Sequence, residues 1–380
     1  MAKLGEVCKV SPSTKNIERQ GAWLLNLDMV EQQTGRVIEY KYVGEDDLNG
    51  SIIQFDTENV LYSKLRPNLN KVVLPPKDGF STSELLPLRP DASVLNKDYL
   101  AAFLRSDSFV TWAVSKTAGA KMPRLGTKDL MNAEIPVPSI EQQKKIAEKF
   151  KKLEQLISLR KQQLAKLDEL VKARFVEMFG DAKLNPNNLP CCSLSEYIVF
   201  LTSGSRGWSQ YFTDSGEYFI TIKNVKNCKI TLQDVQCVTP PDNAEAKRTR
   251  VQENDLLISI TADLGRTGIV TKKIAEHGAY INQHLTCIRL KQDKLNPLYV
   301  AYYMESDAGK EQFIAKNQSA VKAGLNFNAI NSLKLMVPPL ALQNQFAAFV
   351  ERVDQQKQTI QQSIEKLELM KKALMQEYFG

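Results

Sequence analysis

Two stretches of this chain decide its fold: IPVPSIEQQKKIAEKF at residues 135–150 and VPPLALQNQFAAFV at residues 337–350. In each stretch prolines keep the chain extended, because a residue that precedes proline avoids the helical region. In the first stretch Ser139 stands three residues before Gln142, which is the spacing of a capping box at a helix start. Each stretch therefore marks the end of one structural part and the start of a helix.

Apolar residues recur with a 4-3 spacing after each boundary, over nearly five heptads. The spacing predicts helices over 139–180 and 339–380, each roughly 60 Å long at 1.5 Å per residue. A stripe of this length needs a partner, and we expect the two helices to pair antiparallel as an intramolecular coiled coil. The alternative, in which each helix packs only on its own globular part, stays open.

The predicted seam consists of apolar side chains from both helices. They are Ile146, Phe150, Leu153, Ile157, Leu164, Leu167, Val171, Phe346, Val350, Val353, Ile360, Ile364, Leu367 and Leu374. The pattern is broken at Arg160, Arg174, Lys357 and Lys371.

The boundaries belong to a larger internal repeat. Residues 80–180 align with residues 280–380 at a fixed offset of 200 without gaps, and 24 of the 101 positions are identical. The chain is therefore one unit written twice. The segment Leu4-Gly5-Glu6 resembles Leu194-Ser195-Glu196, so the second unit begins where the first helix ends. If the helices are antiparallel, the two chain ends should be neighbours.

The ranges 1–138 and 181–338 contain short β-rich runs separated by turn residues. One helical stretch precedes each proline boundary, from Asn96 to Val114 and from Asn296 to Ala315. The expected fold class is α+β, with two pseudo-two-fold related globular domains at 1–138 and 181–338. The long helices 139–180 and 339–380 would join them.

The composition is that of a globular protein, with 43% hydrophobic and 24% charged residues and a net charge of +7. No apolar run approaches the roughly 18 residues needed to span a bilayer, and MAKLGEV lacks the pattern of a signal peptide. We therefore expect a cytoplasmic protein. The mild basic excess is compatible with a polyanionic partner without identifying one. The six cysteines follow no repeated spacing, which favours reduced thiols.

Signals of catalysis are missing from the sequence. It contains no P-loop motif and no Cys/His cluster with metal-ligand spacing, and it has only two histidines, His277 and His284. The segment Asn185-Pro186-Asn187-Asn188 lacks the second proline and the aromatic residue of the amino-methyltransferase tetrad, and a turn explains it better. We expect no catalytic residue, no metal and no cofactor on this chain.

Basic and amide residues gather in predicted loops at matched places in both units. Arginine and lysine contact phosphates and read guanine edges, whereas asparagine suits adenine. Each loop alone is a common solvated loop, but their recurrence in both units favours nucleic acid. The loops also differ between the units where the helices do not. The candidate DNA contacts are Lys64, Arg66, Asn68, Asn70, Lys71, Lys116, Lys121, Arg124, Lys128, Arg206, Trp208, Lys223, Asn224, Lys226, Arg266, Lys322, Asn326 and Asn328.

The chain resembles the specificity (S) subunit of type I restriction–modification systems over essentially its whole length. The resemblance is carried by VLYSKLRPNLNKVVLP (60–75), NKDYLAAFLRSD (96–107) and the two boundary stretches, in the order that the family places them. It implies that 1–138 and 181–338 are target recognition domains for the halves of a bipartite, asymmetric DNA site. It also implies that the long helices are spacer and docking regions for methylation (M) and restriction (R) subunits. S-adenosylmethionine, ATP and Mg would bind those partners.

Three other functions remain open on the sequence alone. The chain could be a coiled-coil adaptor that binds proteins, with its β-rich parts as docking modules. It could be the recognition subunit of a related restriction or methylation system. A self-sufficient methyltransferase would need a cofactor loop that the sequence does not contain.

Overall fold

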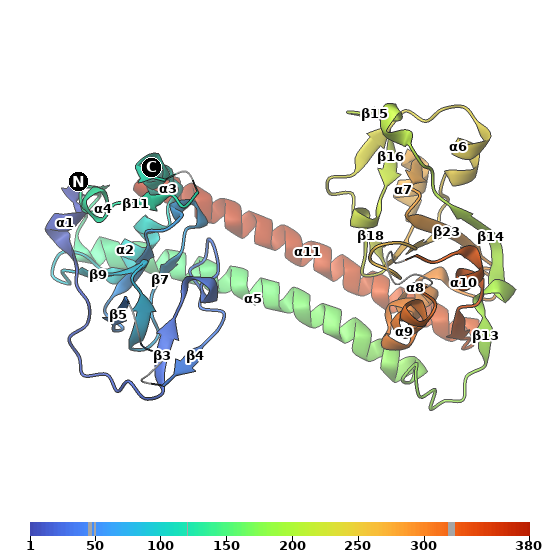
Figure 1. Ribbon diagram of the computed structural model, residues 1–380, viewed down its shortest axis with the longest axis horizontal. Helices are drawn as coiled ribbons and strands as arrows, with labels where there is room; N and C mark the ends of the chain where they lie inside the picture. Colours follow the sequence, from blue (N-terminus) through green and yellow to red (C-terminus); the bar gives the residue numbers. More distant parts are fainter. Residues whose placement is uncertain (45–47, 49–50, 120, 318–323) are drawn as a thin grey trace. The chain divides into compact units, whose positions relative to one another are not determined.

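The computed structural model describes residues 1–44, 48, 51–119, 121–317 and 324–380 (Figure 1). The chain divides into two compact units, which we describe separately. Unit 1 comprises Met1–Gln163 and Ile360–Gly380, and unit 2 comprises Leu164–Thr359. Each unit combines short strands and helices with parts of two long helices, so the predicted α+β class is confirmed.

The long helices are α5 (Ile140–Phe179) and α11 (Leu340–Phe379), which agree with the predicted ranges to within one residue at each end. In unit 1 the ring of Phe150 stacks on the ring of Phe379 with 5.9 Å between centroids. Further along α5, Lys161 Nζ lies 3.5 Å from the carboxylate of Glu368. Because the residue number rises along α5 while it falls along α11, the helices run antiparallel in this unit.

The same direction holds in unit 2. There Asp168 of α5 forms an ion pair with Lys357 of α11, and Phe175 meets Phe346 edge to face at 5.4 Å. The predicted antiparallel pairing is therefore confirmed within each unit. All fourteen predicted seam residues are buried or half-buried.

The charged seam positions have partners. Lys371 Nζ lies 2.9 Å from Glu154, and the same carboxylate accepts a hydrogen bond from Arg105 at 3.3 Å. The guanidinium of Arg174 lies 5.8 Å from the ring centroid of Phe349. Arg160 is bonded to Gln163 on its own helix at 2.8 Å. These pairings let charged side chains occupy an otherwise apolar stripe.

Each unit contains two four-stranded sheets. The first sheet is antiparallel throughout, with order β2-β9-β6-β7 in unit 1 and β14-β23-β20-β21 in unit 2. Its strands are β2 (Cys8–Val10), β9 (Leu85–Pro90), β6 (Val60–Ser63), β7 (Val72–Val73), β14 (Ile198–Ser203), β23 (Leu285–Leu290), β20 (Leu256–Ser259) and β21 (Thr267–Ile269). The identical order shows that the repeat extends to the sheet topology.

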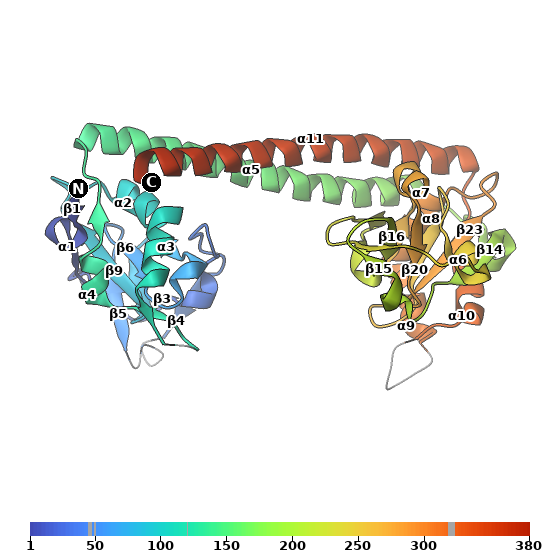
Figure 2. The same ribbon diagram turned by 90° about the horizontal axis from the view of Figure 1, so that it is seen from above.

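The second sheet has order β4-β3-β8-β5 in unit 1 and β15-β19-β16-β22 in unit 2. Each contains one parallel pair, β3 with β8 and β16 with β22. Its strands are β4 (Lys41–Val43), β3 (Ala22–Leu25), β8 (Gly79–Thr82), β5 (Ile52–Phe55), β15 (Phe212–Thr213), β19 (Gln236–Val238), β16 (Glu217–Ile220) and β22 (Ala279–Ile281). Strands β3, β4 and β5 lie on the side of unit 1 away from α5 (Figure 2).

Short pairs and helices complete the units. The paired strands are β1 (Ala2–Lys3) with β12 (Glu134–Ile135), β10 (Thr117–Ala118) with β11 (Arg124–Leu125), β13 (Cys191–Ser193) with β24 (Lys334–Met336), and β17 (Val225–Lys226) with β18 (Lys229–Ile230). The shorter helices are α1 (Leu4–Val7), α2 (Lys97–Leu104), α3 (Asp107–Ser115), α4 (Thr127–Met131), α6 (Ala244–Thr249), α7 (Lys272–His277), α8 (Pro297–Glu305), α9 (Asp307–Ala315) and α10 (Phe327–Asn331). No helix in the described part of the chain is long and apolar enough to cross a membrane.

A buried glutamine fixes the start of each long helix to its unit. The Gln143 side chain is fully buried, accepts a hydrogen bond from the Asn96 backbone N–H at 2.8 Å, and donates to the carbonyls of Val94 and Pro138 at 2.9 and 2.8 Å. In unit 2, Gln343 accepts from Asn296 at 2.8 Å and donates to the equivalent carbonyls. A buried amide with all of these bonds made permits one orientation of the helix start.

A buried ion pair supports the first sheet of each unit. In unit 1 the Asp56 carboxylate lies 2.7 Å from Arg89 and accepts a hydrogen bond from the Ser13 hydroxyl at 2.7 Å. Burial raises the pKa of Asp56, but these two partners outweigh it and hold the pKa below its usual value. In unit 2 the corresponding pair is Asp255 with Arg289, 2.7 Å apart.

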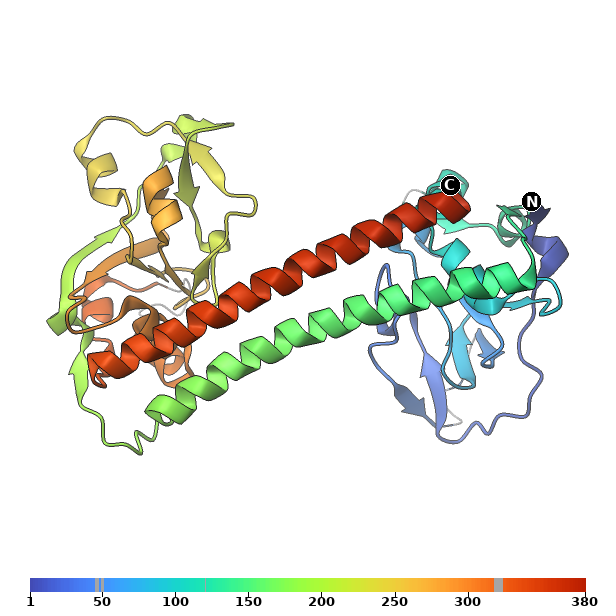
Figure 3. The same cartoon turned by 180° about the vertical axis from the view of Figure 1, so that it is seen from behind.

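Both chain ends lie in unit 1 (Figure 3). Met1 and Gly380 line the same cavity, so the expectation that the two ends are neighbours is confirmed. The Ser108 hydroxyl donates to the carbonyl of Phe379 at 2.6 Å and holds the end of α11 against α3.

Candidate nucleic-acid interface

Two loops that are distant in sequence meet in unit 1. After β6 the chain turns at Arg66, whose backbone is left-handed (φ 49°). The N–H of Arg66 donates to the carbonyl of Pro123 at 2.8 Å, and the N–H of Leu125 donates to the carbonyl of Lys64 at 2.9 Å. The loop at 64–71 is thereby joined to the β10–β11 hairpin, and we call this combined surface the unit 1 loop joint.

The unit 1 loop joint brings together many of the predicted DNA contacts. Arg66, Asn68, Lys121 and Arg124 are exposed there, and Lys64 is half-buried. Arg124 is held by Glu84 at 3.1 Å, which fixes the direction of its guanidinium. Cations and an amide on one exposed joint can donate to phosphates and to base edges.

Two other candidates of unit 1 flank this hairpin in sequence. Lys116 follows α3 directly, and Lys128 lies in α4; both side chains are exposed. They can contribute positive charge, but no bond ties them to the loop at 64–71.

Unit 2 contains a joint of the same construction. The N–H of Leu325 donates to the carbonyl of Ile260 at 2.9 Å, and Thr261 pairs with Gly324. The loop that follows contains Gly265 (φ 80°), where a Cβ atom would lie 2.2 Å from the ring of Phe313. The loop therefore requires glycine to pack against α9.

The predicted contacts at the unit 2 joint differ from those in unit 1. Arg266 is half-buried and forms an ion pair with Asp263. Asn326 caps α10 by accepting from the N–H of Ala329 at 2.8 Å, and Asn328 is exposed on that helix. Lys322 lies outside the described residues.

Four predicted contacts have side chains that are buried or bonded within the fold, and we leave them out of the interface. Asn70 is 7% exposed and donates to the Arg105 carbonyl, while Asn224 is 3% exposed and caps its own turn. Trp208 is 3% exposed within an aromatic cluster. Lys71 donates to the carbonyl of Leu27, and its burial lowers its pKa. Loop position in the sequence did not distinguish these inward-facing side chains from their exposed neighbours.

The remaining candidates, Arg206, Lys223 and Lys226, are exposed in unit 2. Lys226 lies in the β17–β18 hairpin, which reaches β21 through a bridge between Cys228 and Gly268. No described contact joins these three to the unit 2 loop joint. The sequence pattern also missed two exposed tyrosines of β4 and its approach, Tyr40 and Tyr42.

The described residues contain no group of three or more His, Cys, Asp or Glu side chains that could hold a metal ion. Burial raises the pKa of the Cys8 thiol to about 12, which keeps it protonated and a poor nucleophile. His284 is bonded through Nδ1 to the Thr261 hydroxyl at 2.8 Å. These groups have structural partners and form no catalytic constellation.

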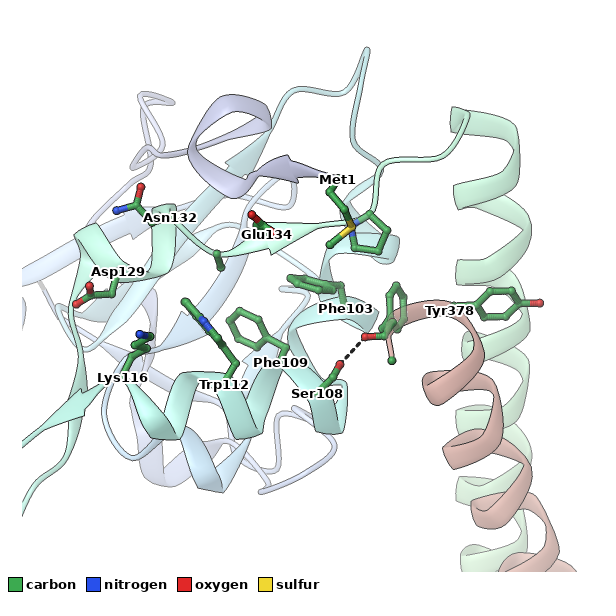
Figure 4. A pocket seen from close by; sticks show the side chains of 14 residues that line it. Met1, Phe103, Ser108, Phe109, Trp112, Lys116, Asp129, Asn132, Glu134 and Tyr378 are labelled. Atoms are coloured by element: carbon green, nitrogen blue, oxygen red, sulfur yellow. Dashed lines mark hydrogen bonds between the residues drawn. The ribbon is translucent and has the colours of Figure 1, made fainter.

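A cavity of about 630 Å³ lies beside the end of α11 in unit 1 (Figure 4). Its floor consists of the rings of Phe103, Phe109 and Trp112, and its rim carries Lys116 and Glu134. In unit 2 the segment 181–190 connects Gly180 to Cys191, and Lys183 in this segment forms an ion pair with Glu311 of α9.

Comparisons with known proteins identify the family of this chain. The family model described as "Type I restriction modification DNA specificity domain" matches residues 1–169 and 207–369. The MjaVIII specificity subunit of Methanocaldococcus jannaschii is 21% identical over 79% of this chain and 73% of its own length. The StySPI subunit of Salmonella potsdam is 24% identical over 73% of this chain and 62% of its own length.

The EcoDI subunit of Escherichia coli is 27% identical over a shorter match, 33% of this chain and 27% of its own length. Among solved structures, a chain from a type I R-M system aligns with a TM-score of 0.62 at 18% identity, over 100% of this chain and 96% of its own. The S subunit of M. genitalium aligns with a TM-score of 0.60 at 14% identity, over 100% and 95%. These two structures share the fold. With the family model matched over both units, the chain belongs to the type I restriction modification DNA specificity domain family.

Proposed function

We propose that this chain is the sequence-reading subunit of a type I restriction–modification complex and that it reads a bipartite, asymmetric DNA site. The carrying observation is the pair of loop joints, each closed by a hydrogen bond from a matched leucine N–H, Leu125 or Leu325, to the loop after β6 or β20, but with different side chains. One scaffold with two unlike loop sets suits two unlike half-sites. Exposed cations at the unit 1 joint, Arg66, Lys121 and Arg124, can supply the phosphate contacts that such binding needs. Unit 2 offers the exposed Arg206, Lys223 and Lys226 outside its joint.

The long helices provide the surface that we assign to partner subunits. Several large apolar side chains on them face solvent, and exposed apolar surface of this kind marks docking sites. They are Leu156 (46% exposed), Leu159 (55%), Leu170 (47%), Val176 (52%), Leu369 (69%) and Met370 (54%). We assign this surface to methylation subunits, with restriction subunits joining the assembly.

In this proposal the chain itself is not an enzyme. S-adenosylmethionine would bind the methylation subunits, and ATP with Mg would serve the restriction subunits. The absence of a cofactor loop from the sequence supports that division. The complex would work in the cytoplasm, where its DNA substrate lies.

The test is a map of adenine methylation in cells with and without this chain, with its partner subunits present in both. The proposal predicts methylated sites with two specified halves and a fixed gap, which disappear when the chain is deleted. An unchanged map would contradict it. A protein adaptor would also bind mixed DNA weakly and with little dependence on salt, whereas phosphate contacts make the affinity fall steeply as salt rises.

A further inference from the structure

A cluster of aromatic rings forms a ledge on the second sheet of unit 1. Trp23 of β3 is 2% exposed, and its cross-strand partner in β4 is Tyr42. Tyr40 lies two residues before Tyr42 and therefore on the same face of the ribbon. Its ring centroid is 5.2 Å from that of Trp23. We call Trp23, Tyr40, Tyr42 and Lys77 the aromatic ledge.

Lys77 extends its ammonium over all three rings. Its Nζ lies 5.2 Å from the ring centroid of Trp23, 4.7 Å from that of Tyr40 and 4.3 Å from that of Tyr42. Gly79 lets strand β8 lie close to Trp23, because a Cβ there would lie 2.7 Å from the carbonyl oxygen of Trp23. Cation–π attraction thus holds one positive charge at a defined place on the surface.

The two tyrosines of the ledge are exposed. Tyr40 is 45% exposed, Tyr42 is 58% exposed, and nearby Ile38 is 57% exposed. Strand β4 is the edge of its sheet, on the side of unit 1 away from α5 (Figure 2). Three large side chains exposed within five residues mark an interaction surface rather than a solvated strand.

The internal repeat contains the same device in altered form. The parallel register pairs Leu24 with Phe80 and Phe219 with Tyr280, and Phe80 and Tyr280 are offset by 200. Strand β16 therefore places Tyr218 where β3 places Trp23.

His277 likewise occupies the position of Lys77 at the offset of 200. The rings of Tyr218 and His277 stack with 3.9 Å between centroids, and His277 is exposed. Each unit thus supports a nitrogen-bearing side chain on an aromatic ring just before β8 or β22.

The two versions differ at the neighbouring strand. In unit 1, β4 is an open edge, whereas in unit 2 its counterpart β19 is covered by β15. Tyr42 is the cross-strand partner of Trp23 in unit 1, whereas Cys237 is the cross-strand partner of Tyr218 in unit 2. The exposed His277 ring donates through Nε2 to the carbonyl of Gly216 at 3.0 Å. The two units thus keep the position of the ring-supported side chain but change its chemistry. This arrangement is expected of two domains that recognise unlike DNA sequences.

We propose that the aromatic ledge contacts the DNA half-site read by unit 1, and that His277 on Tyr218 contacts the half-site read by unit 2. This inference rests on the proposed function. A lysine ammonium and tyrosine hydroxyls donate to phosphate oxygens, which are their common partners in DNA. The exposed rings pack against sugars and thymine methyl groups. A protein partner would not require a ring-supported nitrogen group to recur in both units.

The test uses the full chain assembled with its modification subunits and a duplex carrying the methylated site of the wild type. The variants are Tyr40→Ala with Tyr42→Ala, Lys77→Gln and His277→Ala, with Lys9→Gln on β2 as the exposed control. The double variant Tyr40→Ala, Tyr42→Ala should bind the duplex at least tenfold more weakly and should relax the sequence preference of methylation only in the half-site read by unit 1. Lys77→Gln should lower the slope of log affinity against log salt by about one.

His277→Ala should relax the sequence preference only in the half-site read by unit 2, and Lys9→Gln should change the preference in neither half-site. Thermal unfolding is measured for every variant, and Tyr42→Phe keeps the ring if the double alanine variant fails to fold. If the complex methylates a bipartite site but the variants show unchanged affinity, salt slope and half-sites, the ledge does not contact DNA. That result would leave the proposed function standing. Loss of subunit assembly with DNA recognition intact would assign the ledge to a protein partner. A wild-type complex that methylates no bipartite site would contradict both the proposed function and the role of the ledge.

Discussion

The buried glutamine at the start of each long helix offers a measurable test of how the helices are fixed. Replacing Gln143 by Leu keeps the volume roughly constant but removes three hydrogen bonds, of 2.8, 2.9 and 2.8 Å, from a fully buried site. One net bond is worth about 1 kcal/mol, and the groups left unpaired add to the loss. We therefore expect unit 1 to lose about 3 kcal/mol of unfolding free energy.

Unit 1 contains about 180 residues. For a domain of this size, 1 kcal/mol shifts Tm by about 2–4 °C, so the predicted fall is about 6–12 °C. Scanning calorimetry of the full chain measures it. Gln343→Leu should produce a similar fall in unit 2, because it removes the same three kinds of bond.

Gln155→Leu is the matched control, since Gln155 is exposed on the same helix. It should change Tm by less than about 2 °C. If Gln143→Leu had as small an effect as this control, the glutamine could not be what fixes the helix to its unit.

Three further predictions concern the ends of the chain, acid stability and the loop joint. A permutant that joins Gly380 to Met1 through a copy of segment 181–190 and opens at Asp181 should keep the same methylated sites, because Met1 and Gly380 line one cavity and a short linker can connect them. Failure of the permutant to fold would refute this. Asp56→Asn should destabilise unit 1 by about 3 kcal/mol at pH 7. The pKa of Asp56 is lower in the folded state, so the contribution of Asp56 to the unfolding free energy is present above the unfolded pKa and is lost as pH falls through the folded pKa. The difference in unfolding free energy between variant and wild type should therefore shrink in acid titrations. Arg66→Ala should reduce the salt slope of DNA binding by about one, and an unchanged slope would remove Arg66 from the interface.

The long helices were predictable from sequence because their signal is local and repeated. Proline boundaries and a 4-3 apolar spacing placed α5 and α11 to within one residue at each end. The antiparallel direction also followed, since an apolar stripe of that length needs a partner. Charged positions such as Lys371 looked like interruptions, because their partner Glu154 is distant in sequence.

The site was only partly predictable. Arg66 and Arg124 were both named, but nothing in the sequence indicated that backbone bonds join their loops. Trp208 and Asn224 look like loop residues, yet the fold turns them inward. The aromatic ledge was missed because Trp23 of β3 and Lys77, in the bend before β8, are distant in sequence. The offset of 200 between Lys77 and His277 was available as a signal, but only the strand register makes it meaningful.

Two continuous helices join the two reading units, and we therefore propose that the helices set the gap in the DNA site. Four residues added to both helices at the boundary between the units, after Gln163 and after Thr359, lengthen each helix by about 6 Å. Four residues are close to a full turn, so each apolar stripe continues with a small rotation. The added length corresponds to about two base pairs at 3.4 Å each.

The decisive measurement is the methylation map of cells that carry this double insertion. The account predicts the same two half-sites separated by a gap about two base pairs longer than that of the wild type. The same half-sites with an unchanged gap would contradict it.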